Sequence, residues 1–312
     1  MSGRILITPR SLSKGGHPAL APLVEAGFKL EFPAPGATPT EAQLVAALPG
    51  AVGWLAGVEK VSEAAIGAAD RLRVISRNGT GIDNLPLALL EQRGIAVAKA
   101  EGANARGVAE LALTLALAGL RDVVPTHEGM KHGDWPRRIG REMAGARIGV
   151  VGLGAIGASF AQFCLALGAT VQGYDPYAAP DRVTDPNFGR TDLAGALTGA
   201  HVVSLHAPMP ADGKPLIGAD LLARLAPGAV LVNTARAGLV DADALLAALD
   251  QGQVGTYATD VFETEPPEPS PLLAHPRVIL TSHIGGFTAE SVERATTHAV
   301  ANLLRALAVH AD

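Results

Sequence analysis

Three residues in the last third of the chain have side chains suited to chemistry on a small organic acid: Arg236, Glu265 and His283. Arg236 follows an apolar run at 229–233, and a guanidinium can hold a carboxylate through two parallel hydrogen bonds. His283 follows a second apolar run at 278–280, and imidazole changes its charge near physiological pH. A nearby carboxylate such as Glu265 would favour the protonated imidazolium. Since hydride addition to a carbonyl also needs a proton on oxygen, the three residues are candidates for that chemistry.

A glycine-rich stretch in mid-chain is typical of dinucleotide binding. Residues 152–157 read Gly-Leu-Gly-Ala-Ile-Gly, after an apolar run and before a stretch of helical character. Gly152 permits the tight turn, Gly154 lets the backbone approach a pyrophosphate, and Gly157 lets the helix pack closely on the strand. The framing by strand, helix and strand makes this motif specific, and it predicts a cofactor site at the helix N-terminus.

Asp175 indicates which dinucleotide is bound. It closes the apolar run at 170–174 that follows the glycine-rich helix. A carboxylate at this point can accept a hydrogen bond from a ribose 2′-hydroxyl and repels a 2′-phosphate. Neither Pro176 nor Tyr177 offers a compensating cation, so we predict NAD as the cofactor.

The elements that position these residues are strand-like apolar runs that alternate with helix-like segments. Parallel sheets covered by helices on both faces give this pattern, and its two series predict an α/β protein with two doubly wound domains. The runs lie at 4–8, 52–55, 73–76, 96–98, 148–151, 170–174, 202–205, 229–233, 256–259 and 278–280.

The glycine-rich motif at 152–157 lies too far along the chain to open the first domain. An apolar helix is predicted at 103–121, and a polar stretch at 125–145 joins it to the glycine-rich motif. Gly285 and Gly286 break the chain before a last helix at 289–308, which we expect to return to the first domain. A Rossmann-type cofactor domain would then be inserted in a discontinuous, flavodoxin-like substrate domain, with two hinges and a cleft that can close. The predicted segments are 1–99 for the substrate domain, 100–284 for the cofactor domain and 285–312 for the returning helix.

The composition excludes several other classes of protein. The 312 residues are 48% hydrophobic and 18% charged with a net charge of −5, which disfavours binding to nucleic acid or to a membrane surface. The single cysteine, Cys164, rules out an internal disulfide and is interpreted as a core residue in a reducing compartment. The first residues lack the layout of a signal peptide, and the apolar stretch at 111–120 is too short to span a bilayer. We therefore expect a cytoplasmic protein without a metal site.

Taken together, these stretches resemble the D-isomer-specific 2-hydroxyacid dehydrogenases over nearly the whole chain, and the phosphoglycerate-dehydrogenase branch most. The stretches that carry the resemblance are 77–84, 104–110, 152–157, 206–208, 233–236, 260–262, 265–266 and 283–285.

The resemblance implies a role for each candidate residue. Arg236 would bind the substrate carboxylate and carbonyl, His283 would exchange the proton, and Glu265 would orient and charge the histidine. The main chain of Asn78, Gly79 and Thr80 would meet the substrate carboxylate. Asp260 would lie near the nicotinamide amide. The positions that would line the cofactor are Thr80, Gly152, Gly154, Ala155, Ile156, Gly157, Asp175, His206, Ala207, Pro208, Thr234, Ala235, Asp260, Gly285 and Gly286.

The resemblance leaves the substrate open. The leading hypothesis is an NAD-dependent oxidoreductase for a small D-2-hydroxy or 2-oxo acid, with 3-phosphoglycerate among the candidates. Ala56 stands where well-studied members carry an arginine that meets the phosphate, and we expect no amino-acid-binding regulatory domain after the last helix. A different anion site would need Arg106, Arg138 or Arg141, which we interpret as surface or interface residues. The alternatives are a glyoxylate/hydroxypyruvate reductase that prefers NADPH, and a non-enzymatic NAD-sensing scaffold.

The helix predicted at 103–121 indicates how the chain assembles. It is apolar around much of its circumference, and such helices are usually buried. In the family the matching helix forms the core of a dimer between two cofactor domains. We therefore predict a homodimer, with burial inside the monomer as the alternative.

Overall fold

The computed structural model of the chain describes residues 3–14, 16–82, 84–179 and 181–309. Asp83, in the 77–84 stretch, lies outside these ranges. The chain forms two compact units, Met1–Asn104 with Ala289–Asp312, and Ala105–Thr288. The expected boundaries were 99/100 and 284/285. The chain passes from one unit to the other where helix α6 (Ala105–Leu120) and helix α12 (Ala289–Val309) begin.

The first unit is built on a five-stranded sheet in which every pairing is parallel. Its strand order, β2-β1-β3-β4-β5, is that of flavodoxin-like folds, in which ligands bind where the order reverses, between β1 and β3. The strands are β1 (Arg4–Ile7), β2 (Lys29–Glu31), β3 (Ala51–Ala56), β4 (Val74–Arg77) and β5 (Ala96–Lys99).

Helix α12 completes this unit with residues from the far end of the sequence. Its buried Ala299, Val300, Leu303 and Leu307 belong to the same core cluster as side chains of β1, β3 and β4. The Ser76 hydroxyl on β4 also donates to the Ala299 carbonyl at 2.8 Å. The remaining helices are α1 (Arg10–Ser13), η1 (Pro18–Leu20), α2 (Ala21–Glu25), α3 (Glu41–Ala47), α4 (Glu63–Ala68) and α5 (Leu87–Gln92).

The second unit contains a seven-stranded parallel sheet of order β12-β11-β10-β9-β6-β7-β8. Counted from its first strand this is the Rossmann order, with one strand added beyond β11, and the order reverses between β6 and β9. The predicted fold class is thereby confirmed. The strands are β6 (Arg147–Val151), β7 (Thr170–Tyr174), β8 (Phe188–Arg190), β9 (Val202–Leu205), β10 (Ala229–Asn233), β11 (Val254–Thr259) and β12 (Val278–Leu280).

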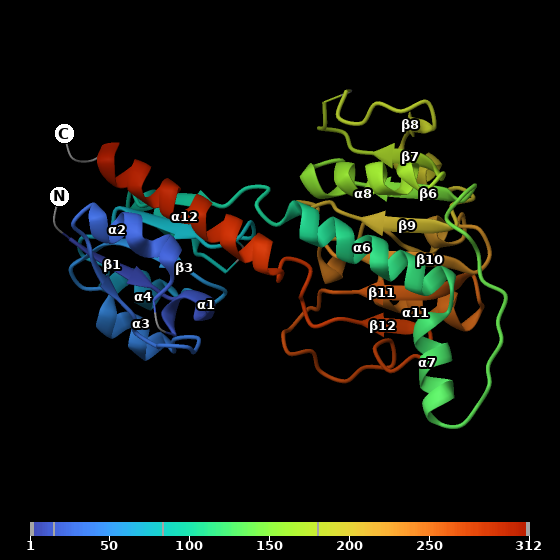
Figure 1. Cartoon of the computed structure of the whole chain (residues 1–312), viewed down its shortest axis with the longest axis horizontal. Helices are drawn as coiled ribbons and strands as arrows, with labels where there is room; N and C mark the ends of the chain where they lie inside the picture. Colours follow the sequence, from blue (N-terminus) through green and yellow to red (C-terminus); the bar gives the residue numbers. More distant parts are fainter. Residues whose placement is uncertain (1–2, 15, 83, 180, 310–312) are drawn as a thin grey trace. The chain divides into compact units, whose positions relative to one another are not determined.

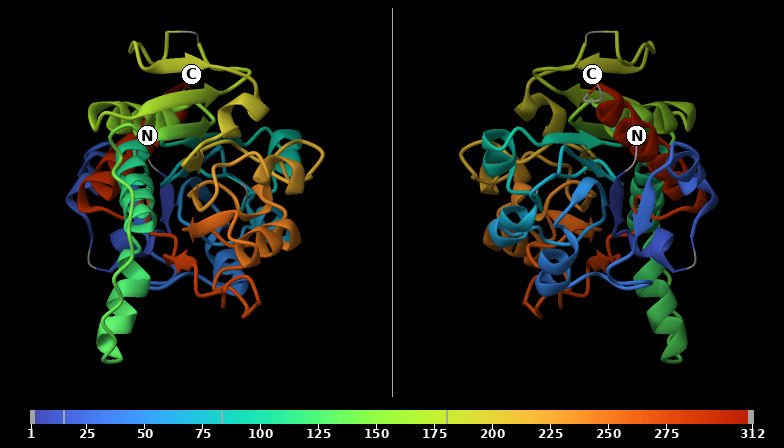
Figure 2. Two further views of the ribbon diagram at one scale, coloured as in Figure 1. Left: turned by 90° about the vertical axis from the view of Figure 1, so that its right-hand side faces the viewer. Right: turned by 90° about the vertical axis from the view of Figure 1, so that its left-hand side faces the viewer.

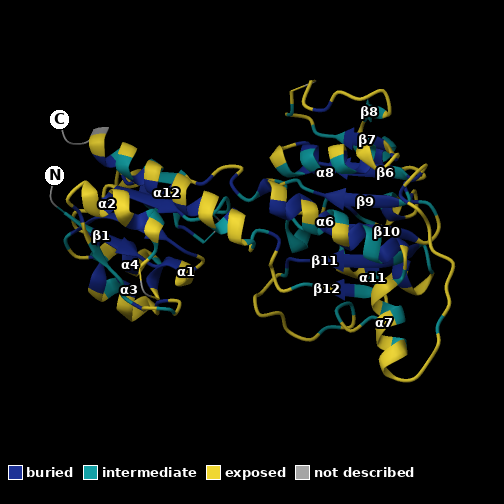
Figure 3. Ribbon diagram, in the orientation of Figure 1, coloured by how far each residue is buried: buried dark blue, intermediate teal, exposed yellow. Residues whose placement is uncertain are grey.

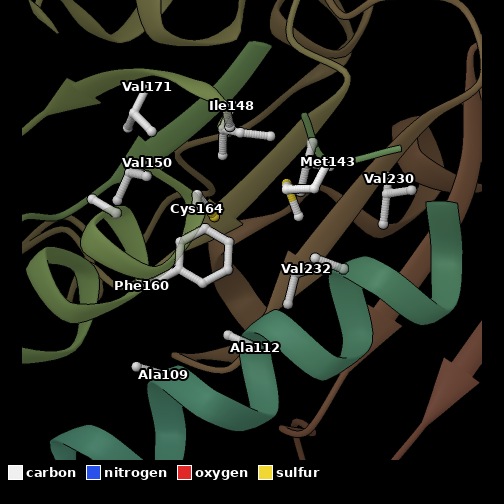
Figure 4. Close-up of a cluster of buried hydrophobic side chains, with 14 of the residues drawn as sticks. Ala109, Ala112, Met143, Ile148, Val150, Phe160, Cys164, Val171, Val230 and Val232 are labelled. Carbon is white, nitrogen blue, oxygen red and sulfur yellow. The ribbon is translucent and has the colours of Figure 1, made fainter. Parts of the chain in front are cut away.

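Helices cover both faces of this second sheet. On one face α6 and α8 (Ala155–Ala166) pack together, and Figure 4 shows Phe160 and Cys164 between strand residues and Ala112 of α6. Burial raises the pKa of the Cys164 thiol to about 12, as expected of a core cysteine. The other face carries α9 (Leu193–Leu197), α10 (Ala219–Leu222) and α11 (Ala242–Asp250). A short helix, η2 (Ala237–Leu239), follows β10.

Three elements differ from the sequence-based expectation. The stretch at 125–145 is not simply a link, because helix α7 (Val123–Lys131) forms over its beginning. None of the residues of α7 is buried. Figures 1 and 2 show the helix projecting from its unit, and Figure 3 shows that most of its residues are exposed. The strands β2 and β8 were missed, because each has only three residues and neither has an apolar run.

Candidate active site

The glycine-rich turn between β6 and α8 has the geometry that its sequence predicted. Gly152 has a φ of +92°, and an added Cβ there would lie 2.6 Å from the carbonyl carbon of His206. At Gly157 a Cβ would lie 1.9 Å from the Gly152 oxygen, so only glycine fits. At Gly154 a Cβ would meet no atom within 4 Å. Packing inside the protein therefore does not explain Gly154, whereas a ligand approaching the backbone does.

The start of α8 is available to an anion. Gly154 and Ala155 are exposed and Ile156 is half-buried. No side chain caps the first turn of the helix, so its N–H groups are not satisfied by a capping residue. This N-terminus fits the pyrophosphate of a dinucleotide.

Asp175 is held against this turn by hydrogen bonds from the main chain. Its Oδ2 accepts from the Leu153 N–H at 2.7 Å, and its Oδ1 accepts from the N–H groups of Tyr177 at 2.8 Å and Ala178 at 3.0 Å. The carboxylate therefore braces the glycine-rich loop in addition to the ribose role that the sequence assigned to it.

The end of β9 supplies the opposite side of the point where the strand order reverses. His206, Ala207 and Pro208 follow this strand, and Gly152 and Gly157 both pack against His206. The His206 Nε2 lies 2.9 Å from the Ser204 hydroxyl, and burial lowers the pKa of its imidazole to about 3. His206 is therefore neutral and unsuited to acid–base catalysis.

Two buried polar atoms here lack a hydrogen-bond partner among the described residues: Nδ1 of His206 and Oγ1 of Thr234. Buried polar atoms are normally satisfied, so each one calls for a partner. Both residues follow strands of the sheet, β9 and β10, at the edge where ligands bind. These orphaned atoms fit a polar cofactor at this edge.

The turn after β10 orients Arg236. The side chain of the fully buried Asn233 accepts from the Ala235 N–H at 3.1 Å and donates to the Arg236 carbonyl at 2.9 Å. The Arg236 Nη1 donates to the Ala235 carbonyl at 2.7 Å, and the residue is half-buried. Asn233 was not chosen as a site residue from the sequence. Its place at a strand end before the arginine was the available signal.

Asp260 holds the loop that carries His283. Asp260 is 2% exposed, and its Oδ1 accepts from the Thr281 hydroxyl at 2.6 Å and the Ile284 N–H at 2.8 Å. Its Oδ2 accepts from the Gly285 N–H at 2.8 Å. His283 lies between these anchored residues with a φ of +55°, a left-handed conformation that is uncommon for residues other than glycine. This anchoring was not foreseen. Gly286, which follows, is half-buried.

His283 and Glu265 form the pair that the sequence predicted. The His283 Nδ1 lies 2.7 Å from Oε1 and 2.9 Å from Oε2 of Glu265. Both side chains are about half exposed, at 54% and 42%, so the pair contributes little to stability. Because Nδ1 faces the carboxylate, Nε2 is the ring nitrogen left to meet a substrate.

The turn at Asn78–Thr80 lies in the first unit, after β4, and all three residues are half-buried. The Asn78 N–H donates to the Ala56 carbonyl at 2.9 Å, so this N–H group is not available to a substrate. Among the described residues, the N–H groups of Gly79 and Thr80 make no such bond and remain candidates for a carboxylate. Ala56 itself is fully buried.

The comparisons with known proteins agree with this geometry. Residues 113–285 match the NAD-binding domain of the D-isomer specific 2-hydroxyacid dehydrogenases. The chain is 37% identical over 273 residues to D-3-phosphoglycerate dehydrogenase of Mycobacterium tuberculosis, a match that covers 86% of this chain and 52% of that protein. It is 34% identical over 255 residues to hydroxypyruvate reductase of Thermotoga maritima, covering 80% and 82%. The chain thus spans about half the length of the first curated relatives it matches, and most of the reductase.

Solved structures give the same picture. A protein from Thermus thermophilus superimposes with a TM-score of 0.86 at 32% identity, over 98% of this chain and 97% of that one. The NAD⁺-bound 3-phosphoglycerate dehydrogenase of Entamoeba histolytica gives 0.80 at 25% identity, over 97% and 94%. Among the described residues of the present chain, no helix has the length and apolarity needed to cross a membrane.

Proposed function

We propose that this chain, which belongs to the D-isomer specific 2-hydroxyacid dehydrogenase family, is an NAD-dependent oxidoreductase that interconverts a small D-2-hydroxy acid and its 2-oxo acid. The observation that carries the proposal is the His283–Glu265 pair in the same unit as the glycine-rich turn. An oriented acid–base pair beside a dinucleotide fold is what this reaction requires. When bound, the nicotinamide supplies or accepts the hydride.

The chain's own residues divide the remaining work. His283 as imidazolium donates its Nε2 proton to the carbonyl oxygen in reduction, and as neutral imidazole it accepts the hydroxyl proton in oxidation. Glu265 fixes the ring by accepting a hydrogen bond from its Nδ1. Arg236 binds the carboxylate with its planar guanidinium. The N–H groups of Gly79 and Thr80, which have no partner among the described residues, are separate proposed donors to a carboxylate. We further propose that Asp260 lies near the nicotinamide amide, at the base of the loop that its carboxylate anchors.

A direct assay tests the reaction. The purified chain is mixed with NADH and, separately, glyoxylate, hydroxypyruvate, 3-phosphohydroxypyruvate and other 2-oxo acids, and NADH oxidation is followed. Turnover with at least one acid supports the proposed reaction. NADH binding without turnover on any of them would instead favour a cofactor-sensing scaffold of the same fold.

The substrate is proposed only as a class. The T. maritima relative is named a hydroxypyruvate reductase, and the M. tuberculosis relative, about twice as long as the matched stretch, a phosphoglycerate dehydrogenase. At the end of β3 the buried Ala56 offers no cation for a phosphate, which supports an unphosphorylated acid. The lone buried thiol of Cys164 favours a reducing, cytoplasmic setting for the reaction.

We predict that NADH is preferred over NADPH, because the Asp175 carboxylate would repel a 2′-phosphate. In Asp175→Ser the preference should narrow, since repulsion is relieved while the ribose loses an acceptor. NADH affinity should also fall because Leu153 N–H loses its partner. The ratio of kcat/KM for the two nucleotides measures this. Equal or better turnover of the unmutated enzyme with NADPH would refute the prediction.

We predict a homodimer formed through the second unit. Leu111, Leu113 and Leu117 of α6 are only partly buried within the chain. Beyond α7, Trp135 is 76% exposed and Ile139 is fully exposed. Such a collection of exposed apolar side chains is typical of an interface.

Light scattering at micromolar protein should therefore give twice the mass of the chain. Replacing both Trp135 and Ile139 with aspartate should shift the mass towards the monomer, because a charge would have to be desolvated in the interface. Tyr177→Asp is the matched control, since Tyr177 is 94% exposed but distant in sequence from α6 and α7. A monomer mass for the unmutated chain would contradict the prediction.

A further inference from the structure

Arg190, which was not among the residues predicted from the sequence, is hydrogen-bonded to the loop that carries Asp175. It ends β8, whose pairing with β7 places it beside Gly173. Its Nη1 donates to the carbonyls of Ala178 and Ala179, both at 2.9 Å, and its Nη2 donates to the Asp175 carbonyl at 2.6 Å. One guanidinium therefore binds three main-chain carbonyls of a single loop.

The loop at 175–179 has few other means of holding its shape. It contains no helix or strand, and none of its residues is buried. Its internal bonds run to the Asp175 carboxylate from Tyr177 and Ala178. A segment with so little apolar packing depends on its polar contacts for order. The carboxylate ties the loop from one side and Arg190 ties it from the other.

We propose that Arg190 is a positioning residue for NAD: it fixes the 175–179 loop so that the Asp175 carboxylate is preorganised for the hydroxyls of the adenosine ribose. The proposal rests on the proposed use of NAD and adds a residue that sets the affinity for it. Ordering the loop before binding removes a cost that the nucleotide would otherwise bear.

The planar fork of Arg190, and not its charge, is what this role needs. Nη1 uses both of its hydrogens on loop carbonyls, so the group is committed to the loop. A lysine ammonium is a compact charge on a flexible stem and cannot reproduce three bonds from one rigid plane. Arg190→Lys should therefore resemble Arg190→Met.

The test measures binding of NADH, of NADPH and of 2′-deoxy-NADH, which lacks the 2′-hydroxyl of the adenosine ribose, by fluorescence titration, alongside the melting temperature of each variant. Arg190→Met should weaken NADH binding about tenfold, the size of one lost hydrogen bond to a charged group. For 2′-deoxy-NADH, which cannot use the 2′-hydroxyl, the same substitution should cost at most about twofold. Arg182→Met is the matched control, because exposed Arg182 follows the same loop but makes no side-chain hydrogen bond to any described residue. It should bind NADH like the unmutated chain.

Three results would overturn the proposal. Equal weakening of both nucleotides would show a general loss of structure, and unmutated affinity in Arg190→Lys would show that charge alone matters. A larger loss for NADPH than for NADH in Arg190→Met would make Arg190 a phosphate receptor instead. If NADH binds but no 2-oxo acid is turned over, the proposed reaction is refuted, while the titrations of the Arg190 variants still test the role of Arg190. If NADH does not bind at all, both proposals are refuted.

Discussion

Replacing His283 is expected to reduce turnover with a 2-oxo acid by roughly 10²–10⁴-fold, the usual contribution of a general acid, while NADH still binds. The reason is that Nε2 is the only ring nitrogen left to donate, since Nδ1 faces Glu265. His283 has a φ of +55°, so alanine would introduce backbone strain as well as remove the proton. Asparagine tolerates this conformation and is therefore the better variant, with alanine beside it. Steady-state turnover and NADH titration measure the two effects separately.

The partner of His283 gives a second test of whether the histidine acts as an acid or merely occupies a tight turn. In Glu265→Gln the Nδ1–H loses its charged acceptor, so the ring is held less firmly and turnover should fall while NADH still binds. If His283 only shapes the loop, Glu265→Gln would lower the melting temperature and leave turnover unchanged. Turnover in Glu265→Gln equal to that of the unmutated chain would refute the pairing.

The parts of this site that could be predicted are those encoded locally. The glycine turn is specified by the left-handed backbone at Gly152 and by the close approach of Gly157 to the Gly152 oxygen, and both limits act within a few residues. His283 and Arg236 could be placed because each follows an apolar run, and parallel strands bring their carboxyl ends to one edge. The alternation of apolar runs was enough to place both residues at strand ends, whereas their roles came from the resemblance to the dehydrogenase family.

The parts that could not be predicted depend on pairs far apart in the chain. Nothing near Asp260 indicates that its carboxylate accepts from Ile284 and Gly285, and nothing near Arg190 indicates that it reaches Ala178. These contacts exist only once β7 and β8, or β11 and β12, lie side by side.

Short or exposed elements could not be predicted from the sequence for a different reason. Strand β8 has three residues and gives no period of alternation to detect. Helix α7 buries none of its residues, so it has no apolar face from which a helix could be read.

Arg236→Lys is expected to keep the fold and lose most of the activity. A point charge does not reproduce the planar fork that can hold a carboxylate and a carbonyl together, and a lost charge-assisted hydrogen bond is worth about 1.5–3 kcal/mol in binding alone. Because the same group would orient the carbonyl for the reaction, KM should rise and kcat should fall together.

The turn that presents Arg236 should survive this change. Asn233 closes it through main-chain groups, the N–H of Ala235 and the carbonyl of Arg236, which the substitution leaves in place. The dissociation constant of NADH should therefore stay close to that of the unmutated chain. Arg277→Lys is the matched control, because this exposed arginine precedes β12 at the amino end of the strand, away from the edge that binds ligands, and should keep normal kinetics. Near-native kcat/KM in Arg236→Lys would remove Arg236 from the proposed site.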